Sequence, residues 1–422
     1  MDKRQLQEIL VDQKEAFQNK TGLIGRDVLS GNYLNTGQIV VITGVRRCGK
    51  SSLLFLIKEA LGLGENEYCY CNFDDERIMQ YPALLSELYM LHLEMYRTEP
   101  VFFFDEIQEV PGWEKFVSRM YEQGRKVYVT GSNATLLSSE ISSSLTGRNK
   151  VLELFPFSFR EYLRLEGKVY SAGQISTSKR ALLLNDLNAY LETGGFPLAV
   201  KEKDPEIAHT LFQDILYRDI VVRYKLSNVD EVKQIALYLA SNTGKLFSYA
   251  TLQTVSGLKS LSSVKNYLQY FEASYLFFYL KKFDYSVKKQ IMNSRKVYAV
   301  DNAIPNRLGF RFSENRGRLL ENVVFIELQR RGCELYYFSG KYECDFLVKE
   351  NLNIIEAIQV TYGLNSENFN REMGGLTEAM QSFSIPKGTL IVFDTGGYPG
   401  KVPQGVSVIP AYEWLMIHES GM

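Results

Sequence analysis

The chain has 422 residues, of which 45% are hydrophobic and 23% charged, with a formal net charge of −1. This length exceeds what one ordinary hydrophobic core needs, and it predicts two or three domains. The near-zero net charge excludes binding to nucleic acid through overall charge, so any basic surface must be local. In chain order, residues 1–20 are polar and no segment reaches the length of a membrane span, which predicts a cytoplasmic protein without membrane contact.

A glycine-framed loop follows the first predicted strand. The run "GQIVVIT" (37–43) is apolar and β-branched, which predicts a buried parallel strand, and "SSLLFLIKEALG" (51–62) repeats leucine at helical spacing. The loop between them matches G-x-x-x-x-G-K-[S/T] at every fixed position. The predicted nucleotide-binding residues are Gly44, Val45, Arg46, Arg47, Cys48, Gly49, Lys50, Ser51 and Ser52.

This strand–loop–helix pattern predicts ATP and Mg²⁺ as ligands. The backbone N–H groups of the loop and the positive end of the helix dipole would point at a phosphate. Lys50 would act as a catalytic residue by neutralising the β- and γ-phosphates, and the Ser51 hydroxyl would bind Mg²⁺. GTP fits poorly because the chain has no N-K-x-D motif. The alternative is an ordinary tight turn between a strand and a helix.

A second signature is a hydrophobic strand that ends in acids. In "PVFFFDEIQEV" (100–110), four apolar residues lead to Asp105 and Glu106. Asp105 is a predicted Mg²⁺ ligand, and Glu106 is the predicted general base that polarises the attacking water. The alternative is a buried strand with acids at its solvated tip.

Two further strands fit the same sheet. "EYCYCNF" (67–73) lies between the two motifs, and "RKVYVTG" (125–131) follows them. Asn133 then stands near a strand end, where a catalytic polar side chain can hold the attacking water or the γ-phosphate. This order of strands is that of the additional-strand ATPases, which include AAA+ proteins.

Five segments together carry a resemblance to a known family: "TGVRRCGKSS", "FFFDEIQ", "VTGSNATLLS", "LTGRNKVLELFPFSFREYL" and "YLETGGFPLAV". Over nearly its whole length the chain resembles a large group of bacterial and archaeal AAA+-like ATPases. The resemblance implies ATP binding and hydrolysis, a winged-helix segment, and a C-terminal domain of unknown function related to the PD-(D/E)XK nucleases.

The resemblance also implies roles for two other motifs. Arg148 would be a catalytic arginine, acting as a sensor or on a neighbouring subunit, because a guanidinium stabilises charge spread over phosphate oxygens. The alternative is a surface arginine in a serine-rich loop. The segment 194–197, "GGFP", resembles a glycine–proline motif that positions a helical lid over the nucleotide, or it forms only a turn between helices.

The segment 227–308 predicts a winged helix-turn-helix. Three amphipathic helices precede a hairpin-like run that contains Lys281, Lys282, Lys288, Lys289, Arg295 and Lys296. In such a fold the third helix enters the major groove and the wing contacts phosphates. The candidate DNA contacts are Lys259, Lys265, Asn266, Lys288 and Lys289. The alternatives are a lid or protein-binding module, with the wing lysines forming a solvated edge.

The remaining segment, 309–422, resembles the PD-(D/E)XK nuclease pattern but lacks its lysine. Glu321 and Asp345 occupy the places of the helix acid and the strand acid. On the next strand either Gln359 or Glu356 takes the third place, and neither register gives a lysine two residues later. Because the carboxylates hold Mg²⁺ while lysine orients the water, the sequence predicts a catalytically silent nuclease-like fold.

The predicted fold class is α/β. An AAA+-like P-loop domain with a helical lid (1–226) precedes the winged helix (227–308) and the nuclease-like α/β domain (309–422). The leading functional hypothesis is an ATP-hydrolysing switch or motor that acts on DNA. A signalling ATPase that binds protein partners is the first alternative, and an ATP-regulated, Mg²⁺-dependent nuclease is the second. The resemblance is compatible with an oligomer.

Overall fold

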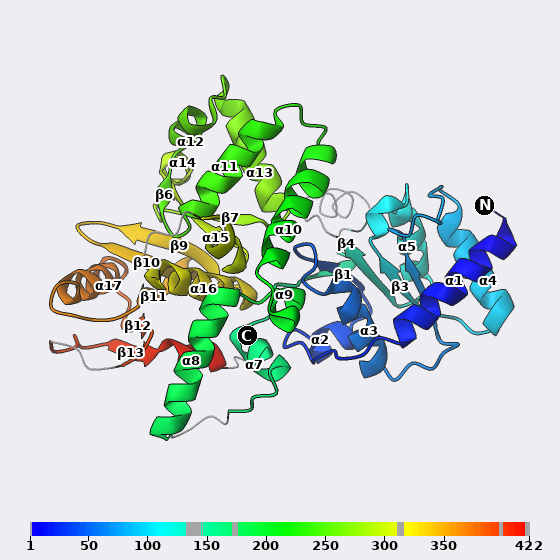
Figure 1. Ribbon diagram of the computed structural model, residues 1–422, viewed down its shortest axis with the longest axis horizontal. Coiled ribbons are helices and arrows are strands. Elements are labelled where there is room, and N and C mark those ends of the chain that lie inside the picture. Colours follow the sequence, from blue (N-terminus) through cyan, green and yellow to red (C-terminus); the bar gives the residue numbers. More distant parts are fainter. Residues whose placement is uncertain are drawn as a thin grey trace. The chain divides into compact units, whose positions relative to one another are not determined.

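The computed structural model describes residues 2–131, 145, 147–170, 176–309, 316–395 and 400–417. The chain divides into two compact units (Figure 1). Unit 1 contains residues 1–155 and 273–275, and unit 2 contains residues 156–272 and 276–422. Helices α7 to η2, within the segment expected to form the lid, therefore pack with unit 2.

Unit 1 contains a five-stranded sheet in which every neighbouring pair is parallel. Its strands are β1 (Ile39–Thr43), β2 (Tyr68–Asn72), β3 (Val101–Asp105), β4 (Val127–Gly131) and β5 (Asn149–Glu153). The order β2-β3-β4-β1-β5 places β4 between the glycine-loop strand and the acid-ended strand. This arrangement confirms the parallel P-loop sheet that the sequence predicts.

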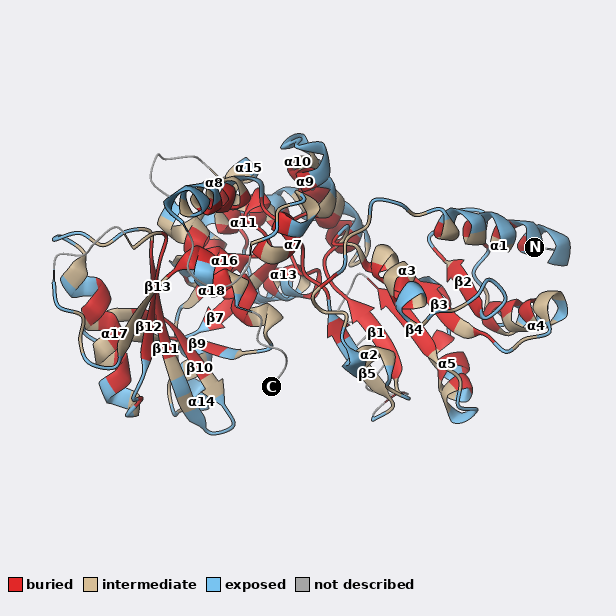
Figure 2. Cartoon of the chain, turned by 90° about the horizontal axis from the view of Figure 1, so that it is seen from below, coloured by how far each residue is buried: buried red, intermediate tan, exposed pale blue. Residues whose placement is uncertain are grey.

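Helices cover both faces of this sheet, so β1, β3 and β4 are largely red in Figure 2, whereas most residues of the edge strand β5 are half-buried or exposed. The helices are α1 (Lys3–Gln18), α2 (Gly31–Leu34), α3 (Lys50–Ala60), α4 (Leu84–Tyr96), η1 (Ile107–Glu109) and α5 (Trp113–Glu122). One face, including Val41 and Phe104, shares an apolar core with α4 and α5. On the other face, Phe17 of α1 stacks on Tyr70 with ring centroids 3.9 Å apart. Burial on both faces explains why these strands read as continuous apolar runs.

Unit 2 begins with helices. They are α7 (Phe159–Leu165), α8 (Thr177–Thr193), α9 (Pro197–Glu202), α10 (Glu206–Asp214), the π-helix η2 (Ile215–Val222), α11 (Val229–Ser241), α12 (Tyr249–Ser256), α13 (Leu261–Ala273), α14 (Val287–Met292) and α15 (Ala303–Leu308). The helices α11 to α13 are interleaved with a three-stranded antiparallel sheet, β6-β8-β7. Its strands are β6 (Leu246–Phe247), β7 (Phe277–Lys281) and β8 (Arg295–Ala299).

A second sheet lies in the C-terminal part of unit 2, with strand order β13-β12-β11-β10-β9. Its strands are β9 (Glu334–Ser339), β10 (Glu343–Glu350), β11 (Asn353–Thr361), β12 (Gly388–Val392) and β13 (Val406–Pro410), and its helices are α16 (Arg316–Arg330), α17 (Phe369–Phe383) and α18 (Ala411–Met416). The first three strands pair antiparallel and the last three parallel. This α/β arrangement agrees with the α/β region predicted at the C-terminus.

The segment between β7 and β8 is not the simple hairpin loop that alternation predicts. It contains α14, and its first residues pair with the second sheet, since the Phe283 amide donates to the Tyr337 carbonyl at 2.9 Å. The Phe283 ring packs edge-on against Tyr336 and Phe383. One end of this segment is therefore fixed to the second sheet by backbone and aromatic contacts.

Candidate functional site

The glycine loop connects the buried strand β1 to the first turn of α3. Gly44 has φ 148°, and a Cβ there would lie 2.1 Å from the Leu154 carbonyl oxygen. Gly49 has φ 104° and precedes α3 directly. Both glycines are therefore required by the backbone path. The loop places the N-terminus of α3 where a phosphate can bind its N–H groups.

Lys50 begins α3 and is only 5% exposed. Its ammonium donates to the carbonyl oxygens of Gly44, at 3.1 Å, and Val45, at 3.3 Å. The same nitrogen lies 4.0 Å from Glu106 Oε1. The predicted phosphate-binding cation and the predicted general base are thus brought together at the carboxyl edge of the sheet.

Asp105 ends β3 with a side chain that is almost fully buried. Burial and the charge of Glu106 raise the pKa of Asp105, while hydrogen bonds from the hydroxyls of Ser51 and Thr130 oppose that shift. The Tyr70 hydroxyl contributes a longer contact to Oδ2, at 3.4 Å. The two predicted Mg²⁺ ligands, Ser51 and Asp105, therefore contact each other directly.

Glu106 adopts a left-handed backbone conformation, with φ 53° and ψ 49°. Its amide donates to Thr130 Oγ1 at 2.9 Å, and the Thr130 hydroxyl donates in turn to Asp105 Oδ1. Its carboxylate accepts a hydrogen bond of 2.7 Å from the Gln108 side-chain amide. Thr130 and Gln108 were not predicted from the sequence. The only available signal for Gln108 was its place two residues after Glu106.

Two basic residues from the segment before β1 also reach the glycine loop. The Lys20 ammonium donates to the Ser51 carbonyl at 2.9 Å. The buried Arg26 guanidinium donates to the carbonyls of Cys48, at 3.0 Å, and Phe155, at 2.7 Å. Burial lowers the pKa of Lys20, and the nearby charge of Asp105 partly offsets that effect. No motif in the sequence singles out Lys20 or Arg26.

Arg148 lies away from the glycine loop and the two acids of its own subunit. It directly precedes β5, and its carbonyl accepts from the Ile39 amide at the start of β1. Because β1 and β5 are parallel, this position lies at the edge opposite the glycine loop. The guanidinium pairs there with Glu122 of α5 at 2.9 Å. The expected sensor role within one subunit is therefore wrong, whereas action on a neighbouring subunit stays a prediction. Asn133 lies outside the described residues.

The predicted DNA contacts lie at the surface of unit 2, where all five side chains are exposed: Lys259, Lys265, Asn266, Lys288 and Lys289. Lys265 lies 5.4 Å from the Tyr249 ring centroid, and Lys289 lies 3.8 Å from Asp284. Lys296 differs from the other basic residues of this segment because it is 2% exposed. The expectation that it belongs to a solvated or DNA-facing wing is wrong.

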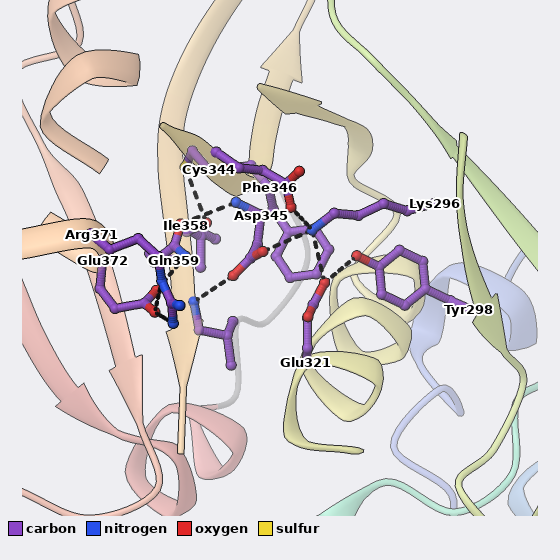
Figure 3. A network of polar contacts seen from close by, with 12 residues as sticks. Lys296, Tyr298, Glu321, Cys344, Asp345, Phe346, Ile358, Gln359, Arg371 and Glu372 are labelled. Carbon is purple, nitrogen blue, oxygen red and sulfur yellow. Dashed lines mark hydrogen bonds and ion pairs between the residues drawn. The ribbon is translucent and has the colours of Figure 1, made fainter. Parts of the chain in front are cut away.

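The predicted nuclease-like residues separate into two groups. Glu321 of α16 and Asp345 of β10 both contact the Lys296 ammonium, as Figure 3 shows. Gln359 joins the same network through the Asp345 amide, which donates to its side-chain oxygen at 3.2 Å. Glu356 instead accepts a hydrogen bond from Thr389 of β12. The register that uses Gln359 therefore places the third residue beside Asp345.

The glycine–proline segment has a packing role in unit 2. A Cβ on Gly194 would lie 1.8 Å from Asp301 Oδ1, and one on Gly195 would lie 2.2 Å from the Phe157 carbonyl oxygen. The Gly195 amide donates to Asp301 Oδ2 at 2.7 Å. The motif thus joins three chain segments by close backbone approach.

Comparison with protein families identifies two matching segments. Residues 36–163 match the family described as "AAA domain". Residues 184–315 match a "Domain of unknown function (DUF8612)". The first segment contains the whole glycine loop, the acid-ended strand and the strands that flank them. The chain is accordingly a P-loop protein with an AAA domain.

Several solved structures show low similarity to the chain. The Holliday junction branch migration motor RuvB of Thermotoga maritima is 15% identical, with 57% of this chain and 81% of that chain covered and a TM-score of 0.28. The replication initiator DnaA bound to AMPPCP and single-stranded DNA is 13% identical, with coverages of 61% and 85% and a TM-score of 0.29. The Aeropyrum pernix ORC1 protein in complex with DNA is 13% identical, with coverages of 64% and 86% and a TM-score of 0.26.

Two relatives match along nearly the whole chain. An uncharacterized protein of Haemophilus influenzae is 29% identical over 401 residues, covering 91% of this chain and 96% of its own length. The uncharacterized protein MJ1544 of Methanocaldococcus jannaschii is 35% identical over 441 residues, covering 99% of this chain and 97% of its own length.

Among the helices of the described residues, none has the length and apolarity needed to cross a bilayer. The chain belongs to the same family as the Methanocaldococcus jannaschii protein MJ1544 and carries an AAA domain at residues 36–163.

Proposed function

We propose that this protein is an ATP-hydrolysing switch or motor that acts on DNA through unit 2. The observation that supports hydrolysis is the convergence of Lys50, Asp105 and Glu106 at one edge of the parallel sheet. Lys50 Nζ lies 4.0 Å from Glu106 Oε1, and Asp105 is hydrogen-bonded to Ser51 of the glycine loop. A structural turn would not require a buried cation and two acids at this place.

The residues at this edge fit Mg²⁺. The Ser51 hydroxyl and the Asp105 carboxylate are oxygen donors in mutual contact, which is the ligand chemistry that Mg²⁺ prefers. When bound, the ion would neutralise charge on the phosphate oxygens. Ser51 would hold it directly, and Asp105 would hold it directly or through water.

Residues of the chain itself would bind the phosphates, accept the proton of water and position the two acids. Lys50 binds phosphate oxygens with its ammonium, and the loop amides do the same with their N–H groups. Glu106 accepts the proton of the attacking water. Thr130 fixes both acids at once, because its hydroxyl lies between the Asp105 carboxylate and the Glu106 amide. Gln108 fixes the direction of the Glu106 carboxylate.

The proposed action on DNA rests on the element order of residues 229–299. Helices α11, α12 and α13 and the strand order β6-β8-β7 are those expected of a winged helix-turn-helix. Exposed Lys259, Lys265 and Asn266 lie at or near the start of α13, the helix that would enter the major groove. Lys288 and Lys289 lie on α14, where they would contact phosphates.

The test is the rate of ATP hydrolysis with and without duplex and single-stranded DNA over a range of salt concentrations. We expect DNA to stimulate hydrolysis, with an effect that falls steeply as salt rises because phosphate contacts release counterions. Lys259→Glu combined with Lys265→Glu should abolish the stimulation and preserve the basal rate. Lys387→Glu, at another exposed lysine of unit 2, is the matched control and should retain the stimulation.

A second candidate function is a signalling ATPase that binds protein partners. Four apolar side chains in and beside α14 are strongly exposed, with 84% for Tyr285, 75% for Met292, 68% for Val287 and 55% for Ile291. Such grouping favours a protein contact over solvent. Stimulation by a co-purifying protein, lost in Met292→Ser and insensitive to Lys265→Glu, would support this function in place of DNA binding.

We also propose a functional division of the chain into an ATPase with its lid (1–226), a winged helix (227–308) and a nuclease-like domain (309–422). The mixed sheet with α16 and α17 beside it supports the last assignment. A nuclease-like domain that does not cleave DNA would serve as a binding module for DNA or for a partner.

A further inference from the structure

We propose that Lys296 is the internal cation of the acidic site formed by Glu321, Glu343 and Asp345, and that its ammonium replaces the divalent metal ion implied by the nuclease resemblance. Lys296 comes from β8, in the three-stranded sheet, whereas Glu321 comes from α16 and Asp345 from β10 (Figure 3). Glu343 is the first residue of β10. Lys296 lies 49 residues before Asp345, far from the strand on which the nuclease pattern has its lysine.

The contacts of Lys296 match the chemistry of an ammonium group. Its nitrogen lies 2.8 Å from Asp345 Oδ1, 2.8 Å from Glu343 Oε1 and 3.1 Å from Glu321 Oε1. An ammonium has three N–H donors and no acceptor. Hydrogen bonds to Asp345 and Glu321 use two of these donors, and Glu343 forms an ion pair with the same nitrogen.

Several other atoms of the site also have protein partners. Asp345 Oδ2 accepts from the Val360 amide at 3.0 Å. The Gln359 side chain accepts from the Asp345 amide and donates to Glu372 Oε2 at 2.7 Å. The Tyr298 hydroxyl donates to Glu321 Oε1 at 2.6 Å. A metal ion would have to break several of these hydrogen bonds to gain its oxygen ligands.

Charge and burial also oppose a divalent metal ion at this site. The Lys296 and Asp345 side chains are 2% and 8% exposed, so a divalent ion among these acids would sit against a positive charge that water does not screen. Burial lowers the pKa of Lys296, but the charges of Asp345 and Glu321 outweigh it and the net shift is well upward, so the charge persists. Among the described residues, no group of three or more His, Cys, Asp or Glu side chains is arranged to hold a metal ion. The residues present therefore do not fit the metal.

Removing the ammonium should convert the site into a metal site. A cavity of about 480 Å³ reaches Glu321, Glu343 and Asp345 from solvent. The three oxygens at 2.8–3.1 Å from the nitrogen need to move only slightly to reach Ca²⁺–oxygen distances of about 2.3–2.6 Å. The wild-type ammonium prevents this, and a methionine at the same position would keep the packing without the charge.

The experiment is calorimetric titration of Ca²⁺ into full-length protein without nucleotide. All variants carry Asp105→Asn, so that the nucleotide site does not contribute. We expect no Asp345-dependent binding with Lys296 present and binding at least about tenfold tighter in Lys296→Met, because a charge repulsion of this kind is removed. Adding Asp345→Asn should abolish the gained binding. Lys349→Met, at a lysine of β10 that pairs with Glu334 of β9, is the matched control and should behave like wild type.

Two results would overturn the proposal. One is Ca²⁺ binding by protein with Lys296 intact that disappears on Asp345→Asn. The other is Mg²⁺-dependent cleavage of linear or circular DNA by wild-type protein that disappears in both Asp345→Ala and Lys296→Met. If Lys296→Met does not fold, the Ca²⁺ titration of protein with Lys296 intact still decides the question, and so does the cleavage assay on wild type and Asp345→Ala. Cleavage lost in Asp345→Ala alone suffices in that case.

Discussion

Glu106, the base that would activate water, is held by its backbone conformation and by two hydrogen bonds. The left-handed backbone of Glu106, with φ 53°, is a conformation that non-glycine residues rarely adopt without support. The support comes from Thr130, which accepts from the Glu106 amide, and from Gln108, which donates to the carboxylate. Strain of this type is typical of sites where the backbone must aim one side chain.

Glu106→Gln should bind ATP normally and hydrolyse it far more slowly. The amide has nearly the same shape as the carboxylate but cannot accept the proton of water, and loss of a general base lowers the rate about 10²–10⁴-fold. Single-turnover hydrolysis and equilibrium binding of a fluorescent ATP analogue measure the two effects separately. Unchanged hydrolysis, combined with its loss in Asp105→Asn, would show that Glu106 is only a strand-end carboxylate.

Gln108 is a positioning residue, so Gln108→Ala should lower kcat for ATP and leave KM nearly unchanged. The lost hydrogen bond frees the Glu106 carboxylate to turn without altering the phosphate-binding loop, and a decrease of about tenfold corresponds to 1.4 kcal/mol. Gln108→Glu places a second carboxylate beside Glu106 and should be more damaging than alanine. If both variants raise KM to the same extent and lose stability to the same extent, the role of Gln108 is purely structural.

At the scale of single elements, Gly194 and Gly195 show how a short motif joins distant segments. The Asp301 carboxylate accepts from the Gly195 amide at 2.7 Å and from the Ala303 amide at 2.9 Å. Burial raises the pKa of Asp301 to about 6 although both backbone hydrogen bonds oppose the shift. The glycines are needed because side chains would occupy the space of Asp301 and Phe157.

Gly195→Ala should strongly destabilise unit 2. Its Cβ would lie 2.2 Å from the Phe157 carbonyl oxygen, a backbone atom that cannot rotate away. Overpacking of this kind costs about 1–3 kcal/mol or more, which lowers the melting temperature by several degrees in differential scanning fluorimetry. Gly363→Ala, where nothing lies within 4 Å, is the control in the same unit. Equal melting temperatures for the two variants would contradict the packing role.

Strands and helices with a clear hydrophobic periodicity could be predicted from the sequence, whereas side-chain contacts between distant segments could not. The apolar runs of β1 and β3 and the helical spacing of α3 predicted the parallel sheet, because both signals depend on local burial. Lys296 was misjudged because Lys288 and Lys289, in the same basic run, are exposed, while its partners Glu321 and Asp345 lie 25 and 49 residues away. Alternation on β8 gives Lys296 and Tyr298 the same face, but no local pattern shows what that face contacts.

At the scale of the whole molecule, the position of Arg148 raises the question of assembly. The arginine lies at the sheet edge opposite the glycine loop of its own subunit, where its partner Glu122 is 59% exposed. An exposed ion pair contributes at most about 1 kcal/mol, so Arg148 can exchange this partner for a more strongly charged one. A neighbouring subunit that presents its bound nucleotide to this edge would supply such a partner.

Arg148→Ala should therefore lower the turnover of ATP on the order of 10³-fold while ATP affinity stays nearly constant, because the guanidinium acts on transition-state charge. Arg125→Ala is the matched control. Arg125 also precedes a strand at that edge and pairs with Glu99 at 2.9 Å, so losing a surface pair there should leave turnover unchanged. Mixing Arg148→Ala protein with Lys50→Ala protein should restore part of the activity, since a Lys50→Ala subunit supplies its intact Arg148 to a neighbour with an intact glycine loop.

Light scattering on the same samples measures the assembly that this rescue requires. A monomer in the presence of ATP, with no rescue at any mixing ratio, would remove Arg148 from the reaction and leave it as a surface arginine of unit 1.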